Sequence, residues 1–410
     1  MGSISRASRI ADEVSFFKRL FRDCDIIFTD SIANDLIQIL GQGRRLTIKF
    51  GVDPTATQLH LGWMVPLRRL RELQNRGHEV ILVIGDTTAQ IGDPTGKSAT
   101  RKMLSEQEVN VNIESLLPAF GKVLDMSRTR VVRNSAWWGK MSATDLLSIC
   151  STVTVSQILE RNDFSNRLEN NQSVGLHEIL YPIFQAHDSV KIGCDIELGG
   201  SDQRFNCLLG RDLMHRADMS PQMVVLTPLL VGTDGTHKMS QSLGNIVSIT
   251  DAPEDMFGKV MSIPDNLIAN WWTLLQIPFE ERLDDLQNGV NPKIIKKELA
   301  SHIVRILCGD EAAERAVNHF EMTFEKRDWQ SNAVELCVDF PESPRSLASC
   351  MVECGLVTST SEARRLIQNG AVELGGVKID NPMLSVTAND IQDKFIKVGK
   401  RRFAKLVVTQ

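Results

Sequence analysis

Polar residues suited to binding anions follow an apolar, strand-like segment near the start of the chain. Asp53 ends the run at 46–52, and QLHLGW (58–63) then opens a helical pattern. A helix start presents free backbone N–H groups and a positive dipole end to an anion. Gly62 would let a flat group approach the backbone, and His60 could donate to a phosphate oxygen as charge develops there. Alone the pattern is weak, because a histidine with a purely structural role is more common.

Two further loops carry lysines in settings that suit polyphosphate. GDPTGK (92–97) follows the second strand-like run, where Asp93 could hold an ammonium group while Lys97 and Arg101 reach phosphates. It does not match GxxxxGK[ST], so a Walker-type ATPase is not indicated. KMSQSLGN (238–245) places Lys238 in a polar, glycine-flanked loop that suits a phosphate clamp. Each loop by itself also fits an ordinary turn.

A helical face and a strand end supply the other polar groups. Tyr181, Gln185 and Asp188 recur at i, i+4 and i+7, which places them on one side of a helix within an apolar segment. We interpret this face as a pocket wall, with a partly exposed helix as the alternative. GGSDQ (199–203) lies where a strand should end and a helix begin, the usual ligand crevice of an open α/β sheet. Asp202 in that motif could accept from ribose hydroxyl groups.

These motifs require a parallel sheet that brings the strand ends to one edge. A helix is predicted at 63–77, and a long helical insert at about 136–192. Apolar strands are predicted at 46–52, 78–86, 129–135, 194–200 and 223–232. Strands alternating with helices predict βαβ units, and hence an α/β, Rossmann-like parallel-sheet domain.

Three domains are expected along the 410 residues. The Rossmann-like domain covers 1–250. The pattern then changes from strands to amphipathic helices, which predicts a helical domain over 251–338. A proline-containing linker at 339–346 leads into a small α+β domain at 344–410. Residues 361–410 hold nine Lys or Arg against five Asp or Glu, although the whole chain has a formal net charge of −5. A basic tail on an acidic body suggests an anionic partner at that end.

Composition argues against several other classes of protein. Hydrophobic residues make up 42% of the chain and charged residues 24%, as in ordinary globular proteins. There is no run of about 18 apolar residues and no apolar secretory segment, so we expect no membrane contact and a cytoplasmic or organellar-matrix protein. The eight cysteines include no CxxC pair and no Cys/His cluster with zinc spacing, which favours reduced thiols and no tightly bound metal. Tyr181 is the only tyrosine.

As a set, HLGW, GDPTGK, YPIFQAHD, GGSDQ and KMSQSLGN strongly resemble a bacterial-type tyrosyl-tRNA synthetase, a class I enzyme whose signatures are HIGH and KMSKS. The resemblance covers nearly the whole chain. It implies a tyrosine–tRNA ligase that makes tyrosyl-adenylate from L-tyrosine and ATP and transfers the tyrosyl group to tRNA-Tyr. It also implies an anticodon-binding type of helical domain, an S4-like RNA-binding tail and a homodimer formed through the helical insert. Mg²⁺ would accompany ATP rather than occupy a site of its own.

By similarity, the motif residues take four roles. The residues expected to act on the leaving pyrophosphate are His60, Lys97, Arg101, Lys238 and Gln241. Tyrosine would be bound by Asp93, Tyr181 and Gln185 at the α-amine, Asp188 at the phenol hydroxyl and Gln203 at the carbonyl. ATP would be bound by Asp53, Gly62, Trp63, Asp202, Lys238, Met239 and Ser240. tRNA would be bound by Arg364, Arg365, Lys400, Arg401 and Arg402.

Two signature positions depart from the family pattern. The second His of HIGH is Trp63, whose indole has one donor, no acceptor and far more bulk. The second Lys of KMSKS is Gln241, which keeps a donor but loses a charge. Lys49 stands where some members carry a tyrosine that contacts the phenol. Because one bacterial subgroup carries Lys at that position, Lys49 does not count as a departure. Trp63 and Gln241 leave two alternatives open: a paralogue that makes tyrosyl-adenylate for a biosynthetic or resistance role, and a non-catalytic RNA-binding relative.

Overall fold

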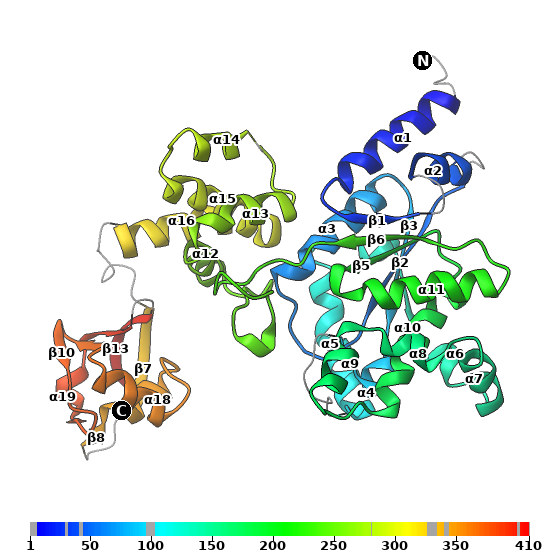
Figure 1. Ribbon diagram of the computed structural model, residues 1–410. Coiled ribbons are helices and arrows are strands. Elements are labelled where there is room, and N and C mark those ends of the chain that lie inside the picture. The colour runs from blue at the N-terminus through cyan, green and yellow to red at the C-terminus, as the bar shows by residue number, and fades with distance from the viewer. Residues whose placement is uncertain are drawn as a thin grey trace. The chain divides into compact units, whose positions relative to one another are not determined.

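The computed structural model (Figure 1) forms two compact units, Met1–Ala313 and Glu314–Gln410. The residues that it describes are 6–28, 32–40, 44–95, 103–279, 281–325, 334–339, 344–399 and 402–409. Among them, no helix is both long and apolar enough to cross a membrane. The division into three domains that we expect from the sequence stays a prediction.

A six-stranded sheet organises the first unit, in the order β1-β6-β5-β2-β3-β4. The strands are β1 (Asp25–Ile27), β2 (Thr47–Val52), β3 (Glu79–Ile84), β4 (Thr129–Arg133), β5 (Ile196–Gly200) and β6 (Met223–Thr227). The five expected strands are confirmed and run parallel, whereas β1 is an antiparallel edge strand that the sequence analysis did not predict. The chain runs from β2 outward to β4 and returns on the other side with β5 and β6. The crevice of such a sheet lies where the order reverses, at the carboxyl ends of β2 and β5.

Helices cover the sheet, which explains its apolar strands. All residues of β6 are buried, and so are all but the first of β3. Helix α3 (Leu61–Asn75) follows β2, and α10 (Leu176–Ile192) packs against α11 (Arg204–Arg216). Ile183 and Ala186 of α10 share a core with Leu209 and Leu213 of α11. This packing fixes which face of α10 is left for the polar residues.

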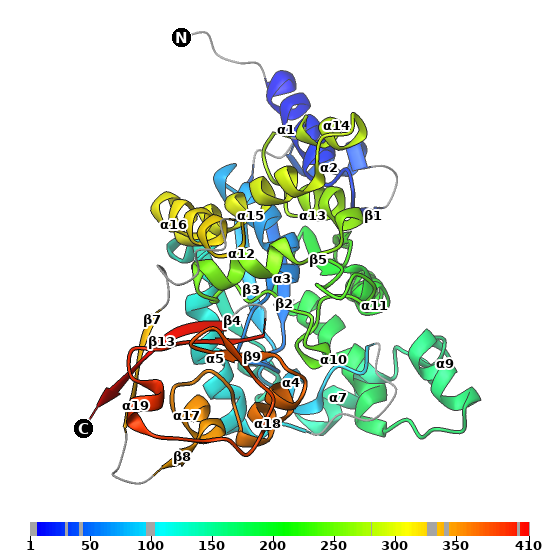
Figure 2. The ribbon, with the colours of Figure 1, turned by 90° about the vertical axis from the view of Figure 1, so that its left-hand side faces the viewer.

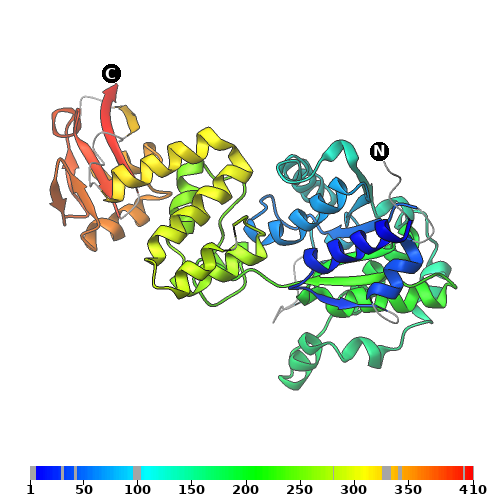
Figure 3. The ribbon, with the colours of Figure 1, turned by 90° about the horizontal axis from the view of Figure 1, so that it is seen from above.

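The remaining helices of the first unit lie before, between and after the strands. Before and around the early strands are α1 (Arg6–Leu20), α2 (Ile32–Leu40), α4 (Thr88–Ile91) and α5 (Glu106–Phe120). The expected insert is confirmed as α6 (Ser135–Trp138), α7 (Ala143–Cys150), α8 (Val155–Leu159), α9 (Asn162–Glu169) and α10. The part around α7 and α9 extends away from the sheet (Figures 2 and 3), whereas α10 packs against β2 and α11. After the sheet come α12 (Pro253–Met261), α13 (Ile268–Leu274), α14 (Arg282–Gln287) and α15 (Pro292–Cys308). The boundary between the two units falls within α16 (Asp310–Phe320).

The second unit is a small α+β body with its own core. Its five-stranded sheet has the order β10-β9-β12-β13-β7, and β8 pairs with β11. The strands are β7 (Val334–Asp339), β8 (Arg345–Ser346), β9 (Val372–Leu374), β10 (Val377–Ile379), β11 (Ser385–Val386), β12 (Phe395–Val398) and β13 (Arg402–Thr409). The helices are α17 (Leu347–Glu353), α18 (Thr360–Gln368) and α19 (Ala388–Ile391).

The position of β7 corrects one expectation. Residues up to 338 were expected to belong to a helical region, but Val334–Asp339 form a strand parallel to β13. Val338 of β7 is fully buried in the core of the second unit together with Leu347 and Leu406. β7 therefore belongs structurally with the tail.

Candidate active site

A cavity of about 300 Å³ lies at the carboxyl ends of β2 and β5. Side chains from all five motifs line it. The predicted site residues among them are Asp53, His60, Gly62, Trp63, Asp93, Tyr181, Gln185, Asp188, Asp202, Gln203, Lys238, Met239 and Ser240. Gln241 is not part of this lining, and Lys97 and Arg101 lie outside the described residues. The crevice predicted from strand order is thus where the motif residues meet.

Asp188 lies buried at one end of the cavity and accepts hydrogen bonds from three side chains. Its Oδ1 accepts from the indole Nε1 of Trp137 at 2.9 Å and of Trp138 at 3.0 Å, and its Oδ2 accepts from Asn134 Nδ2 at 3.2 Å. The ring of Trp138 stacks on Phe184, with centroids 4.0 Å apart. Burial raises the pKa of Asp188 to about 6, although Lys49 and the three donors act in the opposite direction. None of these three donors was predicted from the sequence. The available signal was the pair of adjacent tryptophans just after a predicted strand.

Beneath this end, Lys49 forms a buried ion pair. Its Nζ lies 2.8 Å from Glu197 Oε1 and donates to Ser189 Oγ at 2.7 Å, and the Lys49 side chain is 1% exposed. Lys49 and Glu197 face each other because β2 and β5 pair in that register. Burial lowers the pKa of Lys49, but the neighbouring carboxylates outweigh it and the net direction is upward. Lys49 thus places a fixed positive charge near Asp188.

Asp53 and Tyr181 join the two sides of the cavity. The hydroxyl group of Tyr181 donates to Asp53 Oδ2 at 2.8 Å, and Thr88 Oγ1 donates to Asp53 Oδ1 at 2.6 Å. Gly85 makes room for this arrangement, since a Cβ atom there would lie 2.0 Å from Asp53 Oδ1. Loss of solvent raises the pKa of Asp53 to about 7. The predicted ATP-site residue Asp53 therefore lies in direct contact with the predicted tyrosine-site residue Tyr181.

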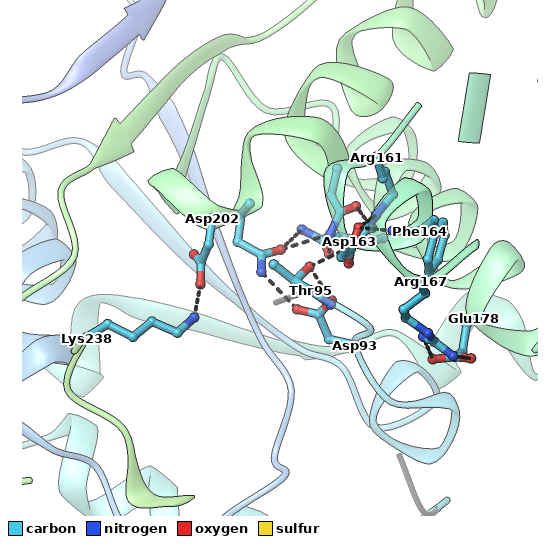
Figure 4. Close-up of polar contacts among 12 residues, drawn as sticks. Asp93, Thr95, Arg161, Asp163, Phe164, Arg167, Glu178, Asp202 and Lys238 are labelled. Atoms are coloured by element: carbon cyan, nitrogen blue, oxygen red, sulfur yellow. Dashed lines mark hydrogen bonds and ion pairs between the residues drawn. The ribbon is translucent and has the colours of Figure 1, made fainter. Parts of the chain in front are cut away.

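A hydrogen-bonded network holds Asp93 (Figure 4). Asp93 Oδ1 accepts from the backbone N–H of Thr95 at 2.9 Å, and Oδ2 accepts from Gln203 Nε2 at 2.9 Å. Gln203 Oε1 in turn accepts from Gln185 Nε2 at 3.2 Å and from Asn206 Nδ2 at 3.0 Å. Thr95 and Asn206 were not predicted as site residues. Thr95 lies within GDPTGK and its bonds to Asp93 are local, so that motif was the available signal. Asn206 lies outside the motifs and also donates to Gln185, 21 positions before it.

At the other end of the cavity, His60 caps α3. Its Nδ1 accepts from the backbone N–H of Gly62 at 3.2 Å, so the ring proton is on Nε2. Burial, aided by the charge of Lys238, lowers the pKa of His60 to about 4. The ring is thus neutral near pH 7 and has one donor to offer. A Cβ at Gly62 would lie 2.9 Å from two ring atoms of His60, so only glycine fits beside it.

The loop that carries Lys238 is shaped by Asn245. The buried Asn245 amide accepts from the backbone N–H of Ser240 at 2.8 Å and donates to the Lys238 carbonyl at 3.1 Å. Lys238 Nζ lies 2.8 Å from Asp202 Oδ2, an ion pair drawn in Figure 4. Gln241 is exposed on the next turn, where its Nε2 donates to Gln58 Oε1 at 3.4 Å.

Trp63 forms part of the wall at this end. Its ring meets Phe50 edge to face, with centroids 6.2 Å apart, and the His60 ring is 6.4 Å away. Among the described residues, the indole N–H of Trp63 has no hydrogen-bond partner. Trp63 therefore contributes bulk and one unused donor to the cavity.

Comparison with known proteins identifies the family. Residues 42–325 match the family model described as tRNA synthetases class I (W and Y), and residues 334–406 match a tyrosine–tRNA ligase SYY-like C-terminal domain. The tyrosine–tRNA ligase of Mannheimia succiniciproducens is 43% identical over 378 residues, covering 91% of this chain and 94% of that protein. That of Moorella thermoacetica is 40% identical and covers 97% of both chains. The chain belongs to the tyrosine–tRNA ligase family of class I tRNA synthetases.

Solved structures of synthetases share the fold. A C-terminally truncated mitochondrial tyrosyl-tRNA synthetase of Aspergillus nidulans superimposes with a TM-score of 0.63 at 19% identity, covering 77% of this chain and 98% of that one. The tyrosyl-tRNA synthetase of Archaeoglobus fulgidus, solved with L-tyrosine, gives a TM-score of 0.59 at 22% identity, covering 75% and 99%. The expected Rossmann-like α/β fold is confirmed.

In this tyrosine–tRNA ligase family member, the predicted tRNA contacts lie in the second unit. Arg364 and Arg365 are exposed on α18. Arg402 on β13 pairs with Glu362 at 3.2 Å. Lys400 and Arg401 lie outside the described residues. Across the described part of the chain, no group of three or more His, Cys, Asp or Glu side chains could hold a metal ion.

Proposed function

We propose that this ligase activates L-tyrosine with ATP, releasing pyrophosphate, and then transfers the tyrosyl group to tRNA-Tyr, releasing AMP. The observation that carries the proposal is the single cavity in which the motifs meet. One end offers buried acceptors for an amino acid, and the other offers a helix start, a neutral histidine and a lysine loop for a nucleotide. Holding both substrates in one enclosure converts a bimolecular reaction into an effectively unimolecular one.

Tyrosine would bind with its ammonium group near Asp93, Tyr181 and Gln185 and its phenol at Asp188. An ionised carboxyl group has about four acceptor positions, and Asp188 uses three of them for Trp137, Trp138 and Asn134. The remaining position suits one phenol hydroxyl. Phenylalanine would leave that buried acceptor unpaired, which is costly. Gln203, bonded to Asp93, is proposed to steady the substrate carbonyl.

ATP would bind across the helix start and the lysine loop. Asp202 is proposed to accept from the ribose, which requires Lys238 to leave its ion pair and turn to the phosphates. The carboxylate of tyrosine would then attack the α-phosphorus while negative charge grows on the leaving pyrophosphate. The Nε2–H of His60 and the Lys238 ammonium would stabilise that charge, together with Lys97 and Arg101. Mg²⁺ is proposed to accompany ATP through its phosphates.

The other partners follow from the same reading. The second unit is proposed to bind tRNA through Arg364, Arg365, Lys400, Arg401 and Arg402, a basic set that would release counterions from the phosphate backbone. A homodimer formed through the insert, and action in the cytoplasm or an organellar matrix, are part of the proposal.

The test separates activation from transfer. Tyrosine-dependent ATP–pyrophosphate exchange measures activation, and charging of tRNA measures transfer, at several salt concentrations. Full-length protein should do both, whereas a protein that lacks residues 326–410 should retain exchange and lose charging. The cut precedes β7 because deletion from residue 344 would leave β7 without its partner β13.

The same two assays distinguish the alternatives. Exchange without charging of any tRNA would favour a paralogue that supplies tyrosyl-adenylate to another acceptor. RNA binding without exchange would favour the non-catalytic relative. Equal charging by the truncated and full-length proteins would remove the RNA-binding role from the second unit.

A further inference from the structure

We infer that Arg161 is a positioning residue that sets the hydrogen-bond direction of the whole ammonium-binding network. It does not line the cavity, and no motif includes it. The inference rests on the proposed function, because it concerns how Asp93, Gln185 and Gln203 are held ready for the tyrosine ammonium group.

Arg161 sits at the start of α9, and its side chain is 4% exposed (Figure 4). Its Nε and one terminal nitrogen donate to the two oxygens of Asp163, at 3.0 and 2.7 Å. The terminal nitrogens also donate to Asn206 Oδ1 at 2.8 Å and to Thr95 Oγ1 at 3.0 Å. Asp163 therefore balances the charge, and the outward donors of Arg161 face the network.

A guanidinium group can only donate hydrogen bonds, and this fixes the orientation of Asn206. Since Asn206 Oδ1 must face Arg161, its Nδ2 faces the cavity and donates to Gln185 Oε1 at 2.9 Å and to Gln203 Oε1 at 3.0 Å. With its oxygen occupied, Gln203 turns its Nε2 towards Asp93 Oδ2. One arginine thus determines which way three amide groups point.

A second route from Arg161 reaches the other oxygen of Asp93. Thr95 Oγ1 accepts from Arg161, so its own proton is directed to Asp93 Oδ1, at 2.5 Å. Both oxygens of Asp93 are then held by donors that Arg161 orients. Without Arg161 the amides could reverse and present N–H groups to a substrate ammonium, which would repel it.

The test compares Arg161 with another buried arginine of the insert. Arg167 forms a bidentate pair with Glu178, at 2.8 and 3.0 Å, and its side chain is 3% exposed. Arg161→Met should raise the KM for tyrosine in pyrophosphate exchange by about ten- to a hundred-fold, the range for a lost charged hydrogen bond, and leave the KM for ATP unchanged. Arg161→Lys should raise it less, because an ammonium cannot reproduce the planar fork. Arg167→Met should lower the melting temperature without changing the KM for tyrosine.

Two further measurements keep the inference falsifiable. 3-(4-Hydroxyphenyl)propanoate lacks the ammonium group, so as a competitive inhibitor it should bind wild type and Arg161→Met equally well. If Arg161→Met fails to fold, Asn206→Leu, which interrupts the same route, should give the tyrosine-specific rise in KM. An unchanged KM for tyrosine, or an equal weakening of the analogue, would overturn the role of Arg161. A wild-type protein without tyrosine-dependent exchange would instead overturn the proposed function.

Discussion

The two ends of the cavity are built on different principles. At the end that holds Asp188, side chains from β2, α6 and α10 are buried and bonded to one another; Asp188 is 4% exposed and Lys49 is 1% exposed. At the other end, Lys238 and Asp202 form a pair whose side chains are 44% and 26% exposed, and Lys238 comes from a loop. The polar groups of the first end are thus fixed by one another, whereas the exposed pair at the second end is the one proposed to open when ATP binds.

This difference explains where the chain departs from its family signatures. An exposed ion pair such as Lys238–Asp202 is worth about 0–1 kcal/mol, so ATP can displace it at little cost. Breaking a buried pair such as Lys49–Glu197 by removing one partner costs about 3–5 kcal/mol. Trp63 and Gln241, the two unusual residues, both lie at the end where single changes disturb few other contacts. A connected network resists substitution and a loop tolerates it.

The largest expected effect is at the buried end. Asp188→Ala removes the acceptor proposed for the phenol and should reduce discrimination between tyrosine and phenylalanine by at least about ten- to a hundred-fold, while the KM for ATP is unchanged. Exchange assays with both amino acids measure this. Asp86→Ala is a matched control, because Asp86 is also buried and bonded to α6, through Ser135, but does not line the cavity. If Asp188→Ala discriminates as well as wild type, the phenol lies elsewhere.

A change in the loop tests the other end. Gln241→Lys restores the family charge near the proposed pyrophosphate site and should raise the rate of adenylate formation by about ten- to a hundred-fold without altering the KM for tyrosine. Pre-steady-state measurement of adenylate formation follows it directly. Leu243→Lys adds the same charge on the same exposed turn and should have no such effect. Equal rates in Gln241→Lys and wild type would indicate that this loop works without the second lysine.

The sequence predicted the buried framework better than the contacts between segments. β3 and β6 were predictable because burial on both faces leaves continuous apolar runs. β1 was missed because its three residues, DII, carry no periodic signal. β7 was missed because it becomes a strand by pairing with β13, which lies about 70 residues further on. Pairing between distant segments is a property of the folded chain.

The same limit applies to the site. The residues of the five motifs could be placed together because strand ends meet at one edge of a parallel sheet. Trp137 and Arg161 could not, because Trp137 bonds to Asp188, 51 positions away, and Arg161 bonds to Asn206, 45 positions away. Asn206 lies outside the motifs, and its place in the site depends on that contact with Arg161. Lys49 was treated as a phenol-contact position, whereas its partner Glu197 follows from the register of β2 and β5.

The titration of the two ends should also differ. Burial raises the pKa of Asp188 to about 6, so in Asp53→Asn, where the neighbouring Asp53 no longer titrates, kcat/KM for tyrosine should fall about ten-fold per pH unit below pH 6. Asp53 is also a predicted ATP-site residue and burial raises its pKa to about 7, so the same variant is used for ATP. Because His60, with its pKa lowered to about 4, stays neutral in this range, the KM for ATP of Asp53→Asn should be flat between pH 6 and 8. A pH profile for each substrate measures these two dependences. If the KM for ATP changed with pH as kcat/KM for tyrosine does, the two ends of the cavity would not titrate separately.

Stability should move in the opposite direction. Because the pKa of Asp53 is raised above its ordinary value of 3.8, the folded protein binds a proton that the unfolded chain releases. The contribution of Asp53 to the free energy of unfolding therefore decreases as the pH rises from about 4 to about 7. Asp53→Asn should remove this part of the slope and leave that of Asp188 when its urea unfolding is compared with that of wild type at each pH.

The smallest expected effect concerns Trp63. Its indole N–H has no partner among the described residues, and its ring adds bulk beside Phe50 and His60. Trp63→His would return a smaller side chain with an acceptor that can meet the ribose, and one such hydrogen bond is worth about 1 kcal/mol, or about five-fold in affinity. We therefore expect the KM for ATP to fall about five-fold with the KM for tyrosine unchanged.

Trp63→Phe is the matched control: it keeps an aromatic ring but offers no acceptor, so it should bring no such gain. A rise in the KM for ATP in Trp63→His that Trp63→Phe does not share would show that the indole itself holds the nucleotide. In that case the exposed end would also be specialised, and the contrast between a fixed amino-acid end and a tolerant nucleotide end would not hold at this residue.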